Sequence, residues 1–195
     1  DNIAGILMAQ RYYDSEMPGF SIPASEHSTI TSWGKDHESC AMKNMLKQYP
    51  TGMVACVSDS FDIYNACENI WGDKLRMDIT KRDGTLVIRP DSGDPLVVLP
   101  RMMNILADKF GATTNASGYK VLNPKVRVIQ GDGIDFDTMP AILEVLRQNG
   151  YSADNIAFGS GGCLLQKLNR DTMKFAFKCS SVVVEGEERD VYKQP

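Results

Sequence analysis

The stretch TLVIRPDSGDPL, residues 85–96, decides the fold of this 195-residue chain. Its apolar run, Leu86 to Ile88, is typical of a buried β-strand, and it ends abruptly at Arg89 and Asp91. An apolar segment with helical periodicity follows over 95–110. A strand that passes through a charged loop into a helix is the repeating unit of α/β proteins, and such loops collect ligands at the carboxyl ends of parallel strands.

The same alternation of strand and helix extends over the whole chain. The periodicity predicts helices at 3–13, 36–49, 61–71, 95–110, 136–149 and 162–169. Apolar runs predict strands at 53–58, 85–89, 126–130, 156–159 and 175–184. The first four strands start roughly 30–40 residues apart, about the length of one βα unit, and their runs are continuous, as expected for parallel strands covered on both faces. We therefore expect one α/β domain over residues 1–195.

Composition and charge narrow the class of protein. The chain is 43% hydrophobic and 24% charged, which is ordinary for a globular protein with a sizeable core. A net charge of −4 without a basic stripe argues against nucleic-acid binding, and no run of eighteen apolar residues suggests a membrane span. Five irregularly spaced cysteines favour reduced thiols in a cytoplasmic protein. Because the sequence begins at Asp1 without a methionine, we expect a piece of a longer polypeptide.

Each of the first four predicted strands ends in polar residues or glycines, more than helix capping requires. These tips are Ser58-Asp59-Ser60, Arg89 to Gly93, Gly131-Asp132-Gly133 and Gly159-Ser160-Gly161-Gly162. Since parallel strands bring their carboxyl ends to one edge, we expect Asp59, Arg89, Asp91, Asp132 and Gly162 to converge on one active-site rim. The glycines of FGSGGCLLQK (158–167) are compatible with a phosphate turn or with a tight structural turn.

The residue types at this rim suit a sugar phosphate with Mg²⁺. Aspartates accept hydrogen bonds from ribose hydroxyls or from metal-bound water, and arginine pairs with phosphate oxygens or stacks on an aromatic base. Arg170 and Lys178 follow the glycine turn and either complete a phosphate cradle or are solvated surface charges. His27 lies beside Glu26 in a polar loop, where a local hydrogen bond and a functional role both remain open.

Five long segments together resemble one family. They are SIPASEHSTITSWGKDHE (21–38), VSDSFDIYNACENIWG (57–72), IRPDSGDPL (88–96), RVIQGDG (127–133) and NIAFGSGGCLLQKLNRD (155–171). In order and over nearly the whole chain, they resemble the nicotinamide-using type II phosphoribosyltransferases. The resemblance implies a parallel (β/α) barrel-like catalytic core that lacks its N-terminal and C-terminal parts, in a protein that is homodimeric when complete. It also implies transfer of a phosphoribosyl group from 5-phosphoribosyl-1-diphosphate to nicotinamide, giving the mononucleotide and diphosphate, with Mg²⁺.

The resemblance assigns roles to individual residues. His27 matches the family's histidine that is phosphorylated by ATP, and Asp59 and Asp91 match acids of the ribose, metal and diphosphate region, so Mg²⁺ is expected near them. Asp1 matches the aspartate that receives the nicotinamide amide. The remaining matches are Arg89 near nicotinamide and ribose, Gly131 and Asp132 at the ribose, Gly161 and Gly162 at the phosphate turn, and Arg170, Lys178 and Lys193 around the phosphates.

The sequence also departs from the family pattern. Ala55 and Ala176 stand where family members can carry serines near the ligand. The aromatic residue that stacks on nicotinamide, with its nearby arginine, would lie before Asp1, and a tyrosine donated by the partner subunit and a further C-terminal lysine are also missing.

Several other functions remain open from the sequence. The nearest is a nicotinate phosphoribosyltransferase of the same fold, against which Asp1 argues because a carboxylate repels nicotinate. A phosphate-binding barrel isomerase or decarboxylase would need a base or Schiff-base lysine at a strand tip. A type I phosphoribosyltransferase would need a Thr-Gly turn, which the acidic VVVEGEERD (182–190) lacks. The chain could finally bind nucleotide without turnover, as an incomplete fragment.

Overall fold

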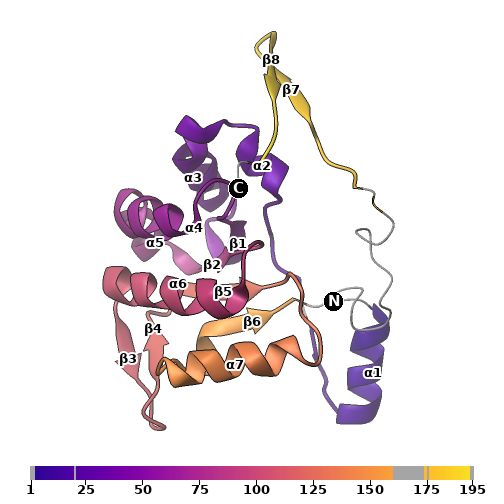
Figure 1. Cartoon of the computed structure of the whole chain (residues 1–195), viewed down its shortest axis with the longest axis vertical. Coiled ribbons are helices and arrows are strands. Elements are labelled where there is room, and N and C mark those ends of the chain that lie inside the picture. Colours follow the sequence, from indigo (N-terminus) through magenta and orange to yellow (C-terminus); the bar gives the residue numbers. More distant parts are fainter. Residues whose placement is uncertain (1–2, 20, 160–173, 175, 194–195) are drawn as a thin grey trace.

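The computed structural model describes residues 3–19, 21–159, 174 and 176–193. Its centre is a parallel sheet of four strands, labelled β1, β2, β5 and β6 in Figure 1. The strands are β1 (Thr51–Val57), β2 (Asp83–Arg89), β5 (Val126–Gln130) and β6 (Ile156–Phe158), in the order β1-β2-β5-β6. The predicted α/β fold with a parallel sheet is therefore confirmed.

The strand order is that of a (β/α) barrel. The four strands of this sheet lie side by side in the order in which they occur in the chain, whereas a doubly wound sheet reverses its order at a switch point. A further segment, Pro23–Ser25, runs beside β1 through hydrogen bonds from Ala55 N to Pro23 O (2.8 Å) and from Ser25 N to Ala55 O (3.1 Å). Within the described residues the sheet is open, with this segment at one edge and β6 at the other.

Helices pack around the sheet and bury its apolar residues. They are α2 (His27–Thr31), α3 (Glu38–Gln48), α4 (Ile63–Asn65), α5 (Arg76–Lys81), α6 (Pro95–Phe110) and α7 (Thr138–Gln148), with 3₁₀ turns at Lys35–His37 and Ala153–Asn155. The core joins strand residues such as Val54 and Ile88 to helix residues such as Leu99 and Leu106. Cys56 and Cys67 are free thiols, as predicted, and both are buried.

The predicted helix 61–71 is two elements instead of one. Asp62 caps α4 by accepting hydrogen bonds from Tyr64 N (2.9 Å) and Asn65 N (3.0 Å), and a π-helix then occupies Ala66–Lys74 before α5. The wider turn places Trp71 entirely inside the core. Apolar periodicity cannot separate these helix types, since each buries one face of the segment.

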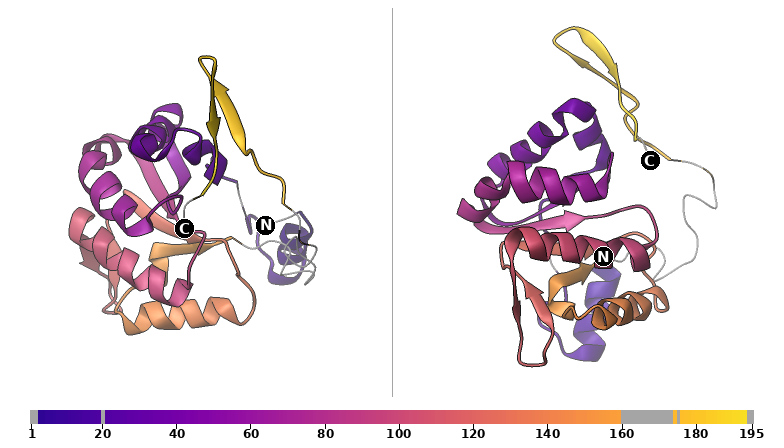
Figure 2. Two further views of the ribbon diagram at one scale, coloured as in Figure 1. Left: turned by 45° about the horizontal axis from the view of Figure 1, so that its top comes forward. Right: turned by 60° about the vertical axis from the view of Figure 1, so that its left-hand side comes forward.

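Two antiparallel hairpins lie outside the central sheet. The first pairs β3 (Ala112–Thr114) with β4 (Lys120–Leu122) around a turn at residues 115–118. The second pairs β7 (Ser181–Val184) with β8 (Glu187–Asp190) and projects from the body in both views of Figure 2.

The second hairpin corrects one prediction. Residues 181–184 of the predicted strand 175–184 do not join the parallel sheet, because Glu185 (φ 54°) and Gly186 (φ 85°) turn the chain straight back on itself. Two successive residues with positive φ form the tight turn that favours a two-strand ribbon. The predicted helix 162–169 lies outside the described residues.

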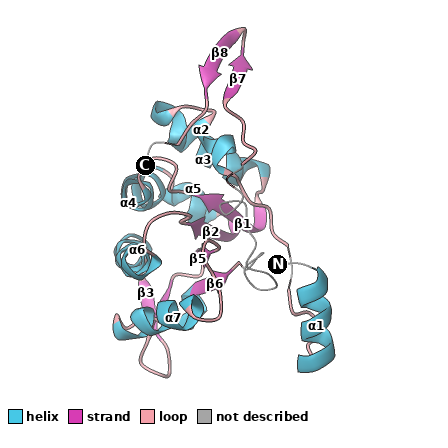
Figure 3. Cartoon of the chain, turned by 45° about the vertical axis from the view of Figure 1, so that its right-hand side comes forward, coloured by secondary structure: helices cyan, strands magenta, loops and turns pink. Residues whose placement is uncertain are grey.

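The first helix stands apart from the body. Helix α1 (Ile3–Tyr13) has no buried residue, and Figure 3 shows it away from the sheet. None of the helices among the described residues is long and apolar enough to cross a membrane.

Candidate active site

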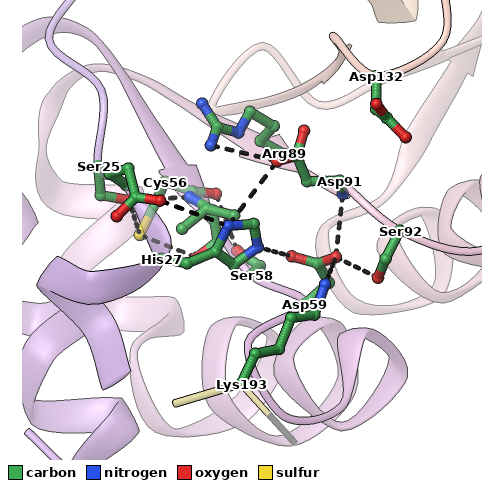
Figure 4. A network of polar contacts seen from close by, with 12 residues as sticks. Ser25, His27, Cys56, Ser58, Asp59, Arg89, Asp91, Ser92, Asp132 and Lys193 are labelled. Carbon is green, nitrogen blue, oxygen red and sulfur yellow. Dashed lines mark hydrogen bonds and ion pairs between the residues drawn. The ribbon is translucent and has the colours of Figure 1, made fainter. Parts of the chain in front are cut away.

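Polar side chains gather where β1 and β2 end, beside the start of α2 and the C-terminal segment (Figure 4). The register pairs Val57 of β1 with Arg89 of β2, so Ser58 and Asp59 leave the sheet next to Pro90 and Asp91. The hydrogen bond from Ser58 N to Arg89 O (3.0 Å) holds the two tips together. The parallel sheet therefore brings the two charged loops to one place, as the sequence predicts.

Asp59 accepts most of the side-chain hydrogen bonds that hold this cluster together. It is only 5% exposed, and its two carboxylate oxygens accept hydrogen bonds from four donors. His27 Nε2 donates to Oδ1 at 2.8 Å, whereas Asp91 N (3.1 Å), Lys193 Nζ (3.0 Å) and the Ser92 hydroxyl donate to Oδ2. Burial would raise the pKa of Asp59, but the hydrogen bonds from His27, Ser92 and Lys193 outweigh burial and hold it well below its usual range. Asp59 is therefore an ionised, fixed carboxylate.

The first turn of α2 positions His27. Glu26 is the N-cap, and its side chain accepts a hydrogen bond from Ser28 N at 2.7 Å while Thr29 Oγ1 accepts one from Glu26 N at 3.1 Å. This reciprocal capping box fixes the backbone immediately before His27. The histidine itself is 7% exposed.

The two ring nitrogens of His27 have different surroundings. Because Nε2 faces the ionised Asp59, the neutral ring carries its proton there and leaves a lone pair on Nδ1. Nδ1 lies 3.8 Å from Asp91 Oδ2 and 3.9 Å from Glu26 Oε1, too far for a hydrogen bond. Nδ1 is thus the nitrogen available for chemistry.

Each carboxylate that flanks Nδ1 has its own cation. Arg89 Nη2 lies 3.6 Å from Asp91 Oδ2, and Lys178 Nζ lies 3.4 Å from Glu26 Oε1. Burial would raise the pKa of Glu26, but its hydrogen bonds from Ser28 and the charge of Lys178 lower it to about 2. Two carboxylates and two cations therefore lie around Nδ1, and the two cations could offset the charge of an anion that binds there.

Arg89 has a donor left over for a ligand. Its Nε is buried and has no hydrogen-bond partner among the described residues. A buried donor without an acceptor costs roughly 1–3 kcal/mol, so a ligand oxygen or a ring face at this point would be favoured.

Hydrogen bonds between neutral, buried groups hold the carboxyl end of β1 in place. Ser58 Oγ donates to Cys56 O (2.9 Å) and accepts from the Trp71 indole nitrogen (3.0 Å), while Ser25 Oγ accepts from Val57 N (2.9 Å). These buried partners fix the backbone from which the Asp59 carboxylate projects.

The structure brings together six of the residues predicted from the sequence: His27, Asp59, Arg89, Asp91, Lys178 and Lys193. Asp132 follows β5 on the same side, but it is exposed and no interaction joins it to the cluster in Figure 4. Gly131 adjoins Gly159, where an added Cβ would lie 3.4 Å from the Gly131 Cα. The predicted residues Asp1, Gly161, Gly162 and Arg170 lie outside the described residues.

Two residues of the cluster were not predicted from the sequence. Ser92 binds Asp59, and Glu26 joins the histidine loop to Lys178. The alternation of strands brings Ser92 to the same edge as Arg89, so the position of the PDSG loop could have indicated it. For Glu26 the available signal is its capping box with Thr29.

The residues partly fit the expected Mg²⁺. The described residues contain no cluster of three or more His, Cys, Asp or Glu side chains that could hold a metal ion. Both oxygens of Asp59 are engaged, whereas the Asp91 side chain is 28% exposed. Since Mg²⁺ binds through one or two carboxylates together with substrate phosphates and waters, Asp91 suits an ion that arrives with a diphosphate.

The fold and the site define a class: an α/β protein whose parallel sheet ends in a buried histidine–aspartate pair beside an arginine. The chain belongs to the nicotinate phosphoribosyltransferase (NAPRTase) family, whose model matches residues 1–195.

Curated relatives extend this finding. A nicotinamide phosphoribosyltransferase of Xanthomonas campestris pv. campestris is 53% identical over 197 residues, which cover 100% of this chain and 42% of that protein. A nicotinamide phosphoribosyltransferase of Mycoplasma pneumoniae is 36% identical over 90% of this chain and 42% of its own length. The chain thus spans about 42% of these relatives.

One solved structure from Saccharomyces cerevisiae, a candidate nicotinate phosphoribosyltransferase, covers 80% of this chain and 33% of its own with 17% identity. Its TM-score of 0.49 is too low to bear on function.

Proposed function

We propose that the complete protein transfers the 5-phosphoribosyl group from 5-phosphoribosyl-1-diphosphate to nicotinamide, releasing nicotinamide mononucleotide and diphosphate. The observation that carries this proposal is the buried His27–Asp59 pair beside Arg89 and Asp91 at adjoining strand tips. The naming of the curated relatives at up to 53% identity supports nicotinamide as the acceptor and NAD salvage as the context.

The reaction needs positioning and electrostatics more than proton transfer. The pyridine nitrogen of nicotinamide attacks C1 of the ribose as the bond from C1 to the diphosphate oxygen breaks, and positive charge develops on the sugar. Fixed carboxylates such as Asp91 stabilise that charge, and the unpaired Nε of Arg89 orients the substrate. Because the ring nitrogen is already nucleophilic, no general base is required. When bound, Mg²⁺ would neutralise the departing diphosphate beside Asp91.

His27 supplies a second reaction that is coupled to the first. Its Nδ1 lone pair attacks the γ-phosphorus of ATP, the bond to the β–γ bridging oxygen breaks, and ADP leaves. Asp59 keeps the proton on Nε2 and stabilises the positive ring as the new bond forms. Arg89 and Lys178 offset the charges of the carboxylates next to Nδ1, which would otherwise repel the phosphoryl group.

The remaining expectations belong to the complete protein. We propose that Lys178, Lys193 and Arg170 bind phosphate groups, that Gly161 and Gly162 form the phosphate turn, and that Gly131 and Asp132 contact the ribose. We also propose a cytoplasmic homodimer in which the partner subunit completes the site. The second candidate function is transfer to nicotinate, which the description of the matching family favours. Separately, we expect residues 1–195 without the rest of the protein to bind nucleotide with little turnover.

The test compares two conservative arginine variants in the complete protein. Arg89→Lys removes the planar fork and Nε, and we expect kcat/KM for nicotinamide to fall by about 10²-fold, the scale of a lost positioning contact. Arg147→Lys, which alters an exposed arginine paired with Glu144 far from the cluster, should change little. Equal losses in both variants would overturn the proposed site.

Substrate choice is tested separately. We expect nicotinamide to be preferred to nicotinate by about 10²-fold, and Asp1→Asn to reduce that ratio, because a carboxylate accepts from the amide and repels the acid. A preference for nicotinate in the unaltered protein would establish the second candidate instead.

A further inference from the structure

A pocket lies near the candidate active site, between the start of α3 and the π-helix Ala66–Lys74. Its volume is about 500 Å³, within the range of small-molecule sites. The buried side chains of Glu38 and Ile70 line it, together with the exposed residues Lys35, Asp62 and Lys74. The proposed reaction uses none of these residues.

Glu38 makes this pocket more than a surface depression. The residue is only 4% exposed, and its Oε1 has no hydrogen-bond partner among the described residues. Buried carboxylates normally have a partner, so this oxygen points to a ligand donor. Burial raises the pKa of Glu38, Asp62 and Asp59 raise it further, and Lys35 opposes them; the result is a pKa of about 7.

The charges around the pocket indicate the kind of ligand. An unpaired carboxylate, with further carboxylates at Asp62 and Asp36, calls for a protonated amine and disfavours a phosphate. The exposed lysines of the lining, Lys35 and Lys74, would repel a simple cation unless the ligand also carried an acidic group.

We propose that this pocket binds a small zwitterion, whose ammonium group donates to Glu38 and whose acidic group faces Lys35 and Lys74. Asp62 follows Asp59 by three residues and caps α4, so the pocket shares the loop that leaves the candidate active site. Binding of the zwitterion is inferred from the pocket and from the unpaired Oε1 of Glu38, and it is independent of the phosphoribosyl reaction.

The test measures binding of three matched probes to the complete protein by ligand-observed NMR: 4-aminobutyrate, butylamine and butyrate. We expect 4-aminobutyrate to bind most tightly and butyrate most weakly. Because Glu38 ionises near pH 7 while the amine stays protonated, 4-aminobutyrate should bind roughly tenfold more tightly at pH 8 than at pH 6. Any other order of the probes, or an affinity that does not rise with pH, overturns the proposal without any variant.

Two variants test whether 4-aminobutyrate binds at Glu38. Glu38→Gln should weaken 4-aminobutyrate at pH 8 by about tenfold and remove the pH dependence. Glu144→Gln is the matched control, since Glu144 is exposed on α7 and pairs with Arg147, and it should leave binding unchanged. Unchanged binding by Glu38→Gln would place the probe elsewhere and refute the site.

Discussion

Replacing Glu38 with glutamine should make the protein more stable at high pH than the unaltered protein. The folded state raises the pKa of Glu38 from 4.5 to about 7, so between these values it holds a proton that the unfolded chain has lost. The stability that this group contributes is complete below pH 4.5 and is lost as the pH rises through 7. A rise of the pKa from 4.5 to about 7 corresponds to roughly 3 kcal/mol, and screening by solvent in the open pocket reduces this to about 1.5–3 kcal/mol.

The assay is urea unfolding of both proteins from pH 5 to pH 8.5. Glutamine stays neutral, so the free energy of unfolding of the variant minus that of the unaltered protein should increase with pH by about 1.5–3 kcal/mol. Glu144→Gln serves as the exposed control and should not show a rise of this sign, because the Arg147 hydrogen bond lowers the pKa of Glu144 to about 2. A difference for Glu38→Gln that stays flat with pH would refute the reasoning.

Three other variants test the site and its scaffold. Asp59→Asn should slow phosphorylation of His27 by ATP by roughly 10³-fold, because an amide can hold the wrong ring tautomer; radiolabel transfer measures this, and a loss under tenfold would contradict it. Gly84→Ala should destabilise the fold by more than about 2 kcal/mol in urea unfolding, since its Cβ would lie 1.9 Å from Gly52 O; unchanged stability would show that the strands can separate. Trp71→Phe should cost about 1–2 kcal/mol by removing a buried indole donor to the tip of β1, and a neutral result would mean that water replaces it.

The central sheet could be predicted from the sequence because each of its strands and helices is marked by a pattern within a short segment of the chain. The apolar run of β2 and the periodic segment 95–110 each stand out alone, and helix α6 has the predicted bounds. Once strand and helix alternate, parallel pairing follows, and with it the meeting of Asp59, Arg89 and Asp91. The convergence of these tips thus needs no knowledge of distant contacts.

The features that were missed depend on partners far away in the chain. The valines of β7 favour a strand in any sheet, and the turn at Glu185 and Gly186 decides that they form a separate hairpin. Glu38 looks like an ordinary first-turn acid until the fold buries it. The contact of Lys193 with Asp59 spans 134 positions, so only the family resemblance, and no periodicity, pointed to that lysine.

The most direct test of the account is to locate the phosphoryl group after the complete protein reacts with ATP. Peptide mapping under alkaline conditions, followed by ¹H–¹⁵N NMR of the modified histidine, identifies both the residue and the nitrogen. The account predicts one acid-labile phosphoryl group on Nδ1 of His27, because Nε2 is held by Asp59 at 2.8 Å. Phosphorylation at Nε2, or at a different residue, would contradict it.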